Sequence, residues 1–176
     1  MKHQIRLIGQ NDRVRKETIK EIENAINIYD SVVKTENEAL DIILTEKSLI
    51  CQKNGISLSV MADGKSLSFM KIEDIYSLFG NAIDNAIEAV IKLDDPEKRF
   101  IRLKIIAQGK MLSVRIENWF EAELKFREGL PVTTKGSEFY HGFGCKSMRA
   151  ICERYNGDLV MRTKNNIFIV DMWFPL

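Results

Sequence analysis

Hydrophobic and polar residues follow one another along this chain with periods that change from helical to strand-like and back. In the first part, apolar residues recur at steps of three and four, namely Ile19, Ile22, Ile26, Tyr29 and Val33. This spacing predicts a helix from Val14 onward whose apolar seam packs against a second helix. A single amphipathic helix packed on a core has the same period and is the alternative. Residues 1–11 resemble the end of a preceding helix, closed by Gly9.

The rest of the chain predicts helices interspersed with paired strands. Helical patterns cover about 36–53, 72–92 and 144–155. Period-two patterns that are typical of half-buried strands cover 56–60, 101–105, 112–116, 158–163 and 167–174. Hairpin turns are expected at Gln108-Gly109 and Asn165-Asn166.

Residues 119–141 have no clean period and contain Gly129, Pro131 and Gly136. They predict a long loop, which compact domains rarely keep without a functional reason.

Strands that follow one another in pairs predict a mixed, mostly antiparallel sheet with helices layered on one face. The fold class is therefore α+β, a two-layer sandwich and not a doubly wound nucleotide fold. Neither Gly-x-x-x-x-Gly-Lys nor Gly-x-Gly-x-x-Gly occurs, so the common phosphate-binding loops are absent from the sequence.

Composition narrows the class of protein further. Of the 176 residues, 45% are hydrophobic and 29% are charged, and the net charge is +1. No basic stretch stands out, which argues against nucleic-acid binding. No apolar run reaches the roughly 20 residues of a membrane span, and no signal peptide begins the chain. The three cysteines form no Cys-x-x-Cys pair, so we expect a reducing, cytoplasmic environment.

The helix predicted over 72–92 carries a polar strip. In LFGNAIDNAIEAV (residues 78–90), a helical period places Asn81, Asp84, Asn85 and Glu88 on one face. Each asparagine costs about 0.5–0.7 kcal/mol in helix propensity relative to Ala, and a merely solvated face would more readily hold Lys and Glu. Asparagine carbonyl oxygens can ligate Mg²⁺, which completes its shell with phosphate and water oxygens. The strip therefore suggests a cation–phosphate site, with a solvated helix face as the alternative.

A second segment with candidate chemistry is TTKGSEFYHGFGCKSMRAICERYNG (residues 133–157). His141-Gly142-Phe143-Gly144 leads directly into the last helical pattern. Glycines at a helix start let backbone N–H groups approach an anion, and the helix dipole favours phosphate. Thr133, Thr134 and Lys135 add hydroxyl donors and a positive charge before it. A glycine-rich turn that merely starts a core helix is the alternative.

Together these segments resemble the ATPase superfamily of gyrases, chaperones, histidine kinases and MutL proteins. The chain is most similar to peptide-pheromone-sensing histidine kinases of the AgrC type, over nearly all of its length from about residue 35. The segments that carry this resemblance are residues 35–47 (TENEALDIILTEK), 78–89 (LFGNAIDNAIEA), 133–135 (TTK), 141–144 (HGFG) and 154–157 (RYNG). The resemblance implies a Bergerat-type ATPase fold, ATP and Mg²⁺ as cofactors, and transfer of the γ-phosphoryl group to a histidine.

The resemblance also implies roles for residues of the polar strip. Asn85 would ligate the Mg²⁺ ion that bridges the ATP phosphates, and Glu88 is a further nucleotide-binding candidate on the same face. Asn81 stands where hydrolysing relatives have a general-base Glu. Because an amide cannot take up the proton, attack by water would be poorly catalysed. This suits an enzyme that hands its phosphoryl group to histidine.

The glycine-containing segment would cover the nucleotide. Gly142 and Gly144 would wrap the phosphates, and Lys135, named with Asn81 and Asn85 as a catalytic candidate, would lie on the lid. Thr134 beside it is a further nucleotide-binding candidate. His141 would belong to the lid as well, with an ordinary turn residue as the alternative.

The sequence departs from the superfamily pattern at the adenine end. An Asp-x-Gly-x-Gly box is missing after the strand, where the chain reads VRIENWFEAEL. AgrC-type proteins are similar in having an asparagine at the strand end, so Asn118 is the candidate for adenine contact. Glu117 is the alternative, and simple strand termination is the other.

The N-terminal part implies a phosphoacceptor close by. Met1-Lys2-His3-Gln4-Ile5 resembles the end of the acceptor segment His-Asp-x-x-Asn/His, which would place the acceptor histidine just upstream of residue 1. His3 would then stand at the later position of that segment, and it is the alternative acceptor. We expect a remnant of the dimerisation and phosphoacceptor helices over 1–34 and an ATP-binding catalytic domain over 35–176.

The expected partners follow from the same resemblance. They are ATP, a response regulator protein and, through the N-terminal helices, a second copy of the kinase. The chain would be the cytoplasmic part of a bacterial membrane protein, attached through segments that lie outside this chain.

Two other functions compete with this interpretation. A noncatalytic module that senses nucleotide by changing shape is favoured by the missing glycine box. A serine-directed kinase of the anti-sigma type would share the fold, but the helical seam over Ile19–Val33 argues against it.

Overall fold

A five-stranded mixed sheet is the framework of the molecule. The computed structural model describes residues 33–121, 124–131 and 143–176. The strand order is β1 (Ser57–Ala62), β2 (Phe100–Gln108), β3 (Met111–Trp119), β7 (Ile167–Pro175) and β6 (Asp158–Lys164). β1 and β2 are parallel, and every other neighbouring pair of this sheet is antiparallel.

Alternation along the strands decides which face of the sheet is buried. In β2 the side chains of Ile101, Leu103 and Ile105 are buried, and the residues between them are exposed. Leu103 pairs with Ile116 of β3, which pairs in turn with Val170 of β7. One continuous apolar surface therefore runs across the central strands.

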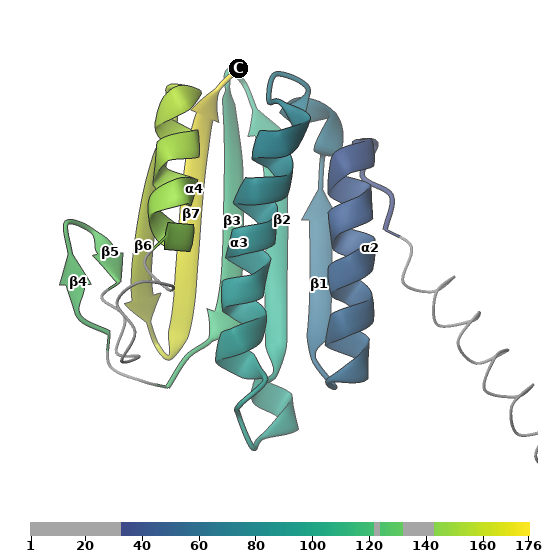
Figure 1. The fold of residues 1–176 in the computed structure, drawn as a ribbon, viewed down its shortest axis with the longest axis vertical. Helices are drawn as coiled ribbons and strands as arrows, with labels where there is room; N and C mark the ends of the chain where they lie inside the picture. The colour runs from purple at the N-terminus through teal and green to yellow at the C-terminus, as the bar shows by residue number, and fades with distance from the viewer. Residues whose placement is uncertain (1–32, 122–123, 132–142) are drawn as a thin grey trace, which may run out of the picture. The chain divides into compact units, whose positions relative to one another are not determined.

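Among the described residues, three helices cover this apolar surface, and none lies on the other face of the sheet (Figure 1). They are α2 (Glu38–Lys53), α3 (Ile72–Val90) and α4 (Phe143–Arg154). α3 packs against both α2 and α4, and it contacts the middle of the sheet. The core between the two layers includes Leu40, Leu44, Leu78, Phe79, Ile83, Val114, Met148, Met172 and Phe174. The predicted α+β two-layer sandwich, with a mixed sheet and helices on one face, is confirmed.

The turns follow the chemistry expected from the sequence. Gly109 between β2 and β3 has a φ of +61°, which glycine adopts without a steric penalty. Asn165 and Asn166 between β6 and β7 have φ values of 51° and 61°. Two successive residues with positive φ form the type of tight turn that matches the twist of an antiparallel hairpin.

Within the predicted loop over 119–141, the structure contains a small hairpin. β4 (Phe126–Arg127) pairs with β5 (Leu130–Pro131) in a separate two-stranded sheet. Glu128 and Gly129 turn the chain between them with φ values of 52° and 73°. Strands of two residues are too short to produce a period in the sequence, so the loop prediction was wrong for this stretch.

Two of the predicted helices lie in the N-terminal part of the chain. The helix expected from residue 36 begins at Glu38, because the side chain of Asn37 caps it by accepting a hydrogen bond from the N–H of Leu40 at 3.0 Å. The helix predicted from Val14 lies outside the described residues apart from Val33. Among the described helices, none has the length and apolar content needed to span a membrane.

Candidate functional site

The polar strip of α3 lies on the side of the helix that the core leaves free. Leu78, Ala82 and Ala86 are buried against the sheet and the neighbouring helices. Asn81 is half-buried, and Asn85 is exposed one turn further on. Glu88, after another turn, is also exposed.

The start of α4 lies directly beside Asn81. A Cβ atom added to Gly144 would lie 3.3 Å from Asn81 Oδ1. The other end of the amide is fixed within α3, because Asn81 Nδ2 donates a hydrogen bond to the carbonyl oxygen of Ser77 at 2.7 Å. The carbonyl oxygen of Asn81 is therefore aimed at the first turn of α4. Two segments far apart in the sequence, the asparagine helix and the Gly-x-Gly helix start, thus form one surface.

Two serines add a polar contact next to this junction. Ser77 Oγ and Ser147 Oγ of α4 are 3.3 Å apart, and either hydroxyl can donate. Neither serine is among the site residues predicted from the sequence. Ser77 stands one helical turn before Asn81, on the same face, and this spacing is the signal that could have identified it.

Asp84 lies on the flank of α3 that faces α2, away from α4. Its carboxylate is 2.8 Å from Lys47 Nζ of α2, and the Lys47 side chain is largely buried. Burial lowers the pKa of Lys47, but hydrogen bonds and charges, first from Asp84 and then from Glu46, raise it, and the pKa is raised overall. Of the four polar residues predicted to share one face, Asp84 therefore serves to connect α2 with α3.

Asn118 points toward the helices, and Glu117 points away from them. Asn118 is only 2% exposed, and in the alternation of β3 it lies on the same side as buried Ile116. Its Nδ2 donates to the carbonyl oxygen of Trp119 at 2.8 Å. Glu117 faces the other side of the sheet, near Arg115. β3 continues through Trp119, so the strand does not end at Asn118.

The remaining predicted site residues, Thr134, Lys135, His141 and Gly142, lie outside the described residues, as does His3. The described hairpin just before them is joined to α4. Arg149 Nη1 donates to the carbonyl oxygen of Glu128, at the tip of this hairpin, at 2.8 Å. Sequence reasoning missed this contact because it depends on two positive-φ residues in a stretch without a period.

The described residues fit Mg²⁺ only together with a nucleotide. In this part of the chain, no three His, Cys, Asp or Glu side chains come together as a metal site. A cation beside α3 would therefore need amide oxygens and phosphate oxygens, a set that Mg²⁺ accepts. Asn85 supplies an exposed amide one turn from Asn81.

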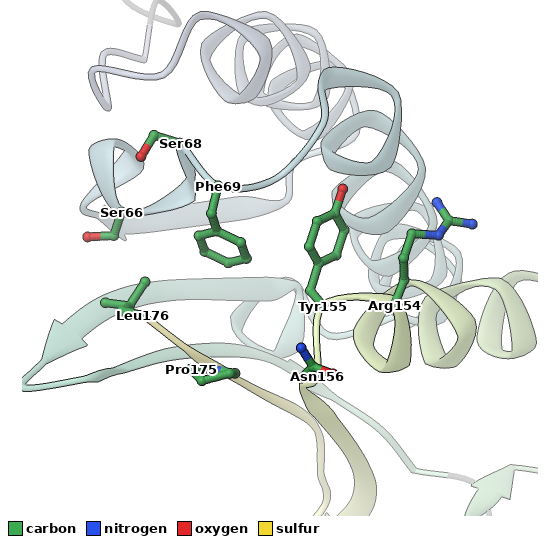
Figure 2. A pocket seen from close by; sticks show the side chains of 8 residues that line it. All are labelled: Ser66, Ser68, Phe69, Arg154, Tyr155, Asn156, Pro175 and Leu176. Atoms are coloured by element: carbon green, nitrogen blue, oxygen red, sulfur yellow. The ribbon is translucent and has the colours of Figure 1, made fainter.

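A cavity lies at the other end of α4. It has a volume of about 520 Å³ and is lined by residues that include Phe69, Tyr155, Asn156 and Leu176. Figure 2 shows the rings of Phe69 and Tyr155 side by side, and their centroids are 5.6 Å apart in an edge-to-face arrangement. Arg154 lies ten positions after Gly144 in α4, which corresponds to roughly 15 Å along the helix axis. This cavity is therefore distinct from the asparagine–glycine surface.

Comparison with known families decides the class of this domain. A model described as GHKL domain matches residues 70–175, from the start of α3 to the end of β7. The chain belongs to the GHKL family. Among curated proteins, no sequence matches the chain.

Solved structures share the fold of this GHKL domain. The catalytic domain of histidine kinase ThkA, in a nucleotide-free form, has a TM-score of 0.59 at 17% identity, covering 81% of this chain and 93% of that chain. The Acinetobacter baumannii histidine kinase AdeS has a TM-score of 0.53 at 11% identity, covering 93% of this chain and 79% of that chain. At these identities the likeness concerns the fold alone. The narrower resemblance to AgrC-type kinases stays a prediction.

Proposed function

We propose that this GHKL domain binds ATP with Mg²⁺ and is the catalytic domain of a sensor histidine kinase, which transfers the γ-phosphoryl group to a histidine. The observation that carries the proposal is the close approach of Asn81 of α3 to Gly144 at the start of α4, where an added Cβ atom would lie 3.3 Å from Asn81 Oδ1. It joins an amide-bearing helix face to a glycine-containing helix start. Amide oxygens hold a cation, and the N–H groups at a helix start hold phosphate.

In this proposal Asn85 would supply an oxygen ligand to Mg²⁺, and phosphate oxygens and water would supply the other ligands. Asn85 is exposed on the same side of α3 as Asn81, so its side chain is accessible to a nucleotide. When bound, the ion neutralises charge that develops on the transferred phosphoryl group. Glu88, one turn further, is the outer member of the strip.

Asn81 favours phosphotransfer over hydrolysis. Its Nδ2 is engaged with Ser77, and its Oδ1 faces Gly144. An amide oxygen can orient a group by accepting a hydrogen bond, but it cannot remove a proton from water as a carboxylate can. Without a base, water is a poor competitor, and the phosphoryl group can reach histidine.

For adenine, the alternation of β3 supports Asn118 over Glu117. Asn118 lies on the helix side of the sheet, where α3 and α4 also lie, whereas Glu117 faces the opposite side. An asparagine side chain presents both a donor and an acceptor, which suits the edge of a purine base.

The residues outside the described part complete the proposal. Lys135, Thr134, His141 and Gly142 would surround the phosphates. Residues 1–34, of which only Val33 and Lys34 are described, would belong to the dimerisation and phosphoacceptor helices, with the acceptor upstream of residue 1 or at His3. A response regulator would receive the phosphoryl group, and membrane attachment would come from other parts of the kinase.

Binding of nucleotide is tested by titration calorimetry with ATP in the presence and absence of Mg²⁺. The chain should bind MgATP, and Asn85→Ala should weaken binding by at least about tenfold, the loss expected when a charged ligand loses one polar partner. Asp84→Asn is the matched control: it stands one residue away, but its partner is Lys47. If Asn85→Ala binds MgATP as tightly as the natural chain does, the assignment of the cation site is wrong.

Catalysis is tested separately from binding. A form of the protein that extends upstream to the acceptor histidine should produce acid-labile, base-stable phosphohistidine from ATP. A protein that binds MgATP tightly yet never produces phosphohistidine would instead be a nucleotide-sensing module. That alternative is supported by the absence of an Asp-x-Gly-x-Gly box at the end of β3, where the chain reads Asn118-Trp119-Phe120.

A further inference from the structure

The chain enters α2 through a short segment that is tightly bonded to the rest of the domain. Thr35 is only 5% exposed. Its backbone N–H and its hydroxyl both donate to the same oxygen, Asp41 Oδ1, at 2.7 and 2.6 Å. A charged acceptor that receives two short hydrogen bonds holds its donors more firmly than a neutral acceptor does.

Gly64, just after β1, fixes the other side of Thr35. Its N–H donates to the carbonyl oxygen of Thr35 at 2.9 Å. A Cβ atom at position 64 would lie 2.4 Å from Thr35 Oγ1 and 2.5 Å from the Thr35 carbonyl oxygen. A residue with a side chain would fit at position 64 only if the backbone moved. The segment at Thr35 and the turn at Gly64 are therefore packed directly against each other.

The neighbouring residues restrict the segment further. Glu36 adopts a φ of 68°, a left-handed conformation that is unusual for a residue other than glycine. Its carboxylate also forms an ion pair with Lys65. Asn37 caps α2, and the N–H of Val33 donates to Thr45 Oγ1 at 3.4 Å. Each contact ties the segment to α2 or to the turn after β1.

We infer that these residues form a fixed joint, which we call the Thr35 joint: Val33–Asn37 together with Asp41 and Gly64. The chain at residue 33 therefore moves with the catalytic domain as one body. The effect of the joint on phosphotransfer rests on the proposed function. In that function the acceptor histidine lies N-terminal to residue 33, so the Thr35 joint is the point where the chain that carries the acceptor enters the domain that binds ATP.

The joint should affect phosphotransfer but not the binding of MgATP. In the proposed function, binding of MgATP depends on α3, α4 and β3, whereas the hydrogen bonds described for the joint go to α2 and to the turn after β1. Phosphotransfer depends on the relative placement of nucleotide and histidine, where a small misplacement costs on the order of a hundredfold in rate. Loss of the joint should therefore lower phosphotransfer and leave nucleotide affinity unchanged.

Amide hydrogen exchange on the 176-residue chain tests the joint itself. The N–H groups of Thr35 and Gly64 should exchange as slowly as those in the middle of α2. In Asp41→Ala the Thr35 amide should lose its protection while Leu103, in the middle of β2, keeps its own. Glu38→Ala is the matched control, because it removes an exposed acid from the same helical turn and should leave Thr35 protected. Unprotected exchange of Thr35 in the natural chain would overturn the inference.

The consequence is tested in a form that extends to the acceptor histidine. Asp41→Ala should lower the rate of phosphohistidine formation by about tenfold or more, with the Kd for MgATP changed less than about twofold. Asp41→Asn, which keeps one acceptor oxygen, should restore part of the rate. If Asp41→Ala proves poorly folded, shown by loss of Leu103 protection, Thr35→Val removes the hydroxyl bond with almost no change of shape.

Two failures can be told apart. An Asp41→Ala protein that forms phosphohistidine at the natural rate would overturn the role of the joint and leave the proposed function intact. A natural chain that fails to bind MgATP would instead refute the proposed function, and the exchange measurements would still decide whether the joint exists.

Discussion

Gly157 occupies a position where no side chain fits. α4 ends when Asn156 takes a φ of 55°, and the N–H of Gly157 donates to the carbonyl oxygen of Cys152 at 2.8 Å. This is a left-handed helix end of the kind that Asn and Gly favour. A Cβ atom at Gly157 would lie 2.4 Å from the carbonyl oxygen of Trp173 and 2.6 Å from the ring of Phe174. We expect Gly157→Ala to lower the free energy of unfolding by about 3 kcal/mol, measured by urea titration.

Gly80→Ala is the control for that measurement and should act in the opposite direction. Gly80 lies inside α3, and a Cβ atom there would meet no atom within 4 Å. Alanine in a helix interior is favoured over glycine by about 0.5–1 kcal/mol. A destabilising Gly80→Ala, or a neutral Gly157→Ala, would contradict the packing described at these two residues.

Single residues also mark the limit of what the sequence predicts about the site. A helical period was enough to place Asn81 and Asn85 on one face, because that depends only on local geometry. The departure of Asp84 toward Lys47 was not predicted, since it requires knowing that α2 packs on that flank. Asn118 and Glu117 could not be separated until the burial of β3 showed which side faces the helices.

At the scale of elements, the start of α3 is tied to the end of α4. Asp74 in the first turn of α3 is 5% exposed, accepts a hydrogen bond from Tyr155 Oη at 2.6 Å and is bonded to Arg154. Tyr155 Oη in turn accepts the N–H of Lys71 at 2.9 Å. The hydrogen bond from Tyr155, followed by the bond and charge of Arg154, outweighs the effect of burial and holds the pKa of Asp74 below its usual value.

The direction of this pKa shift fixes how the link depends on pH. A carboxyl group whose pKa is lower in the folded state stabilises the protein above its unfolded pKa of about 3.9, and the contribution is lost as pH falls through the folded value. Asp74→Asn should therefore cost about 2 kcal/mol at pH 7 and clearly less near pH 3, by urea unfolding at both pH values. Glu73→Gln, an exposed neighbour, should change stability little at either pH. A cost for Asp74→Asn that is equal at both pH values would refute the charged link.

Elements with a long period were predictable, and short ones were not. The helices now seen as α2, α3 and α4 follow from apolar spacing over several turns, and the β6–β7 turn follows from Asn165-Asn166. β4 and β5 have two residues each, so they depend on the turn at Glu128 and on the bond from Arg149. Such elements are stabilised by contacts outside their own sequence.

At the scale of the whole molecule, the class of sheet was predictable but the strand order was not. Paired strand patterns indicated antiparallel neighbours, yet β3 pairs with β7 from the far end of the chain, and β1 pairs with β2 in parallel across the intervening α3. These pairings place α3 in the centre of the helical layer and thereby set Asn81 next to α4. The site is therefore a product of the strand order as much as of its own residues.

The strand order also creates a charge cluster on the face of the sheet opposite α2, α3 and α4. Asp171 of β7 is 2% exposed. Arg115 of β3 donates to it through Nε at 2.6 Å and Nη2 at 3.2 Å, and Arg162 of β6 donates through Nη2 at 2.7 Å. The two arginine side chains are 41% and 40% exposed, whereas the Asp171 side chain that they pair with is 3% exposed. Three strands are linked through one buried charge.

This arrangement predicts that the stability costs of replacing Arg115 and Arg162 are not additive. Arg115→Ala or Arg162→Ala alone should cost about 1 kcal/mol, because the other arginine still pairs with Asp171. The double variant leaves a buried carboxylate without a partner, for which the cost is about 3–5 kcal/mol, well above the sum of the two single changes. Lys104→Ala with Lys164→Ala, two exposed lysines on the same sheet, should be additive within about 0.5 kcal/mol. Replacing Asp171 by Ala in the double variant should recover stability, since it removes the stranded charge. Urea unfolding of the set decides the matter: a strictly additive Arg115/Arg162 pair would mean that Asp171 reaches water by itself and does not hold the strands together.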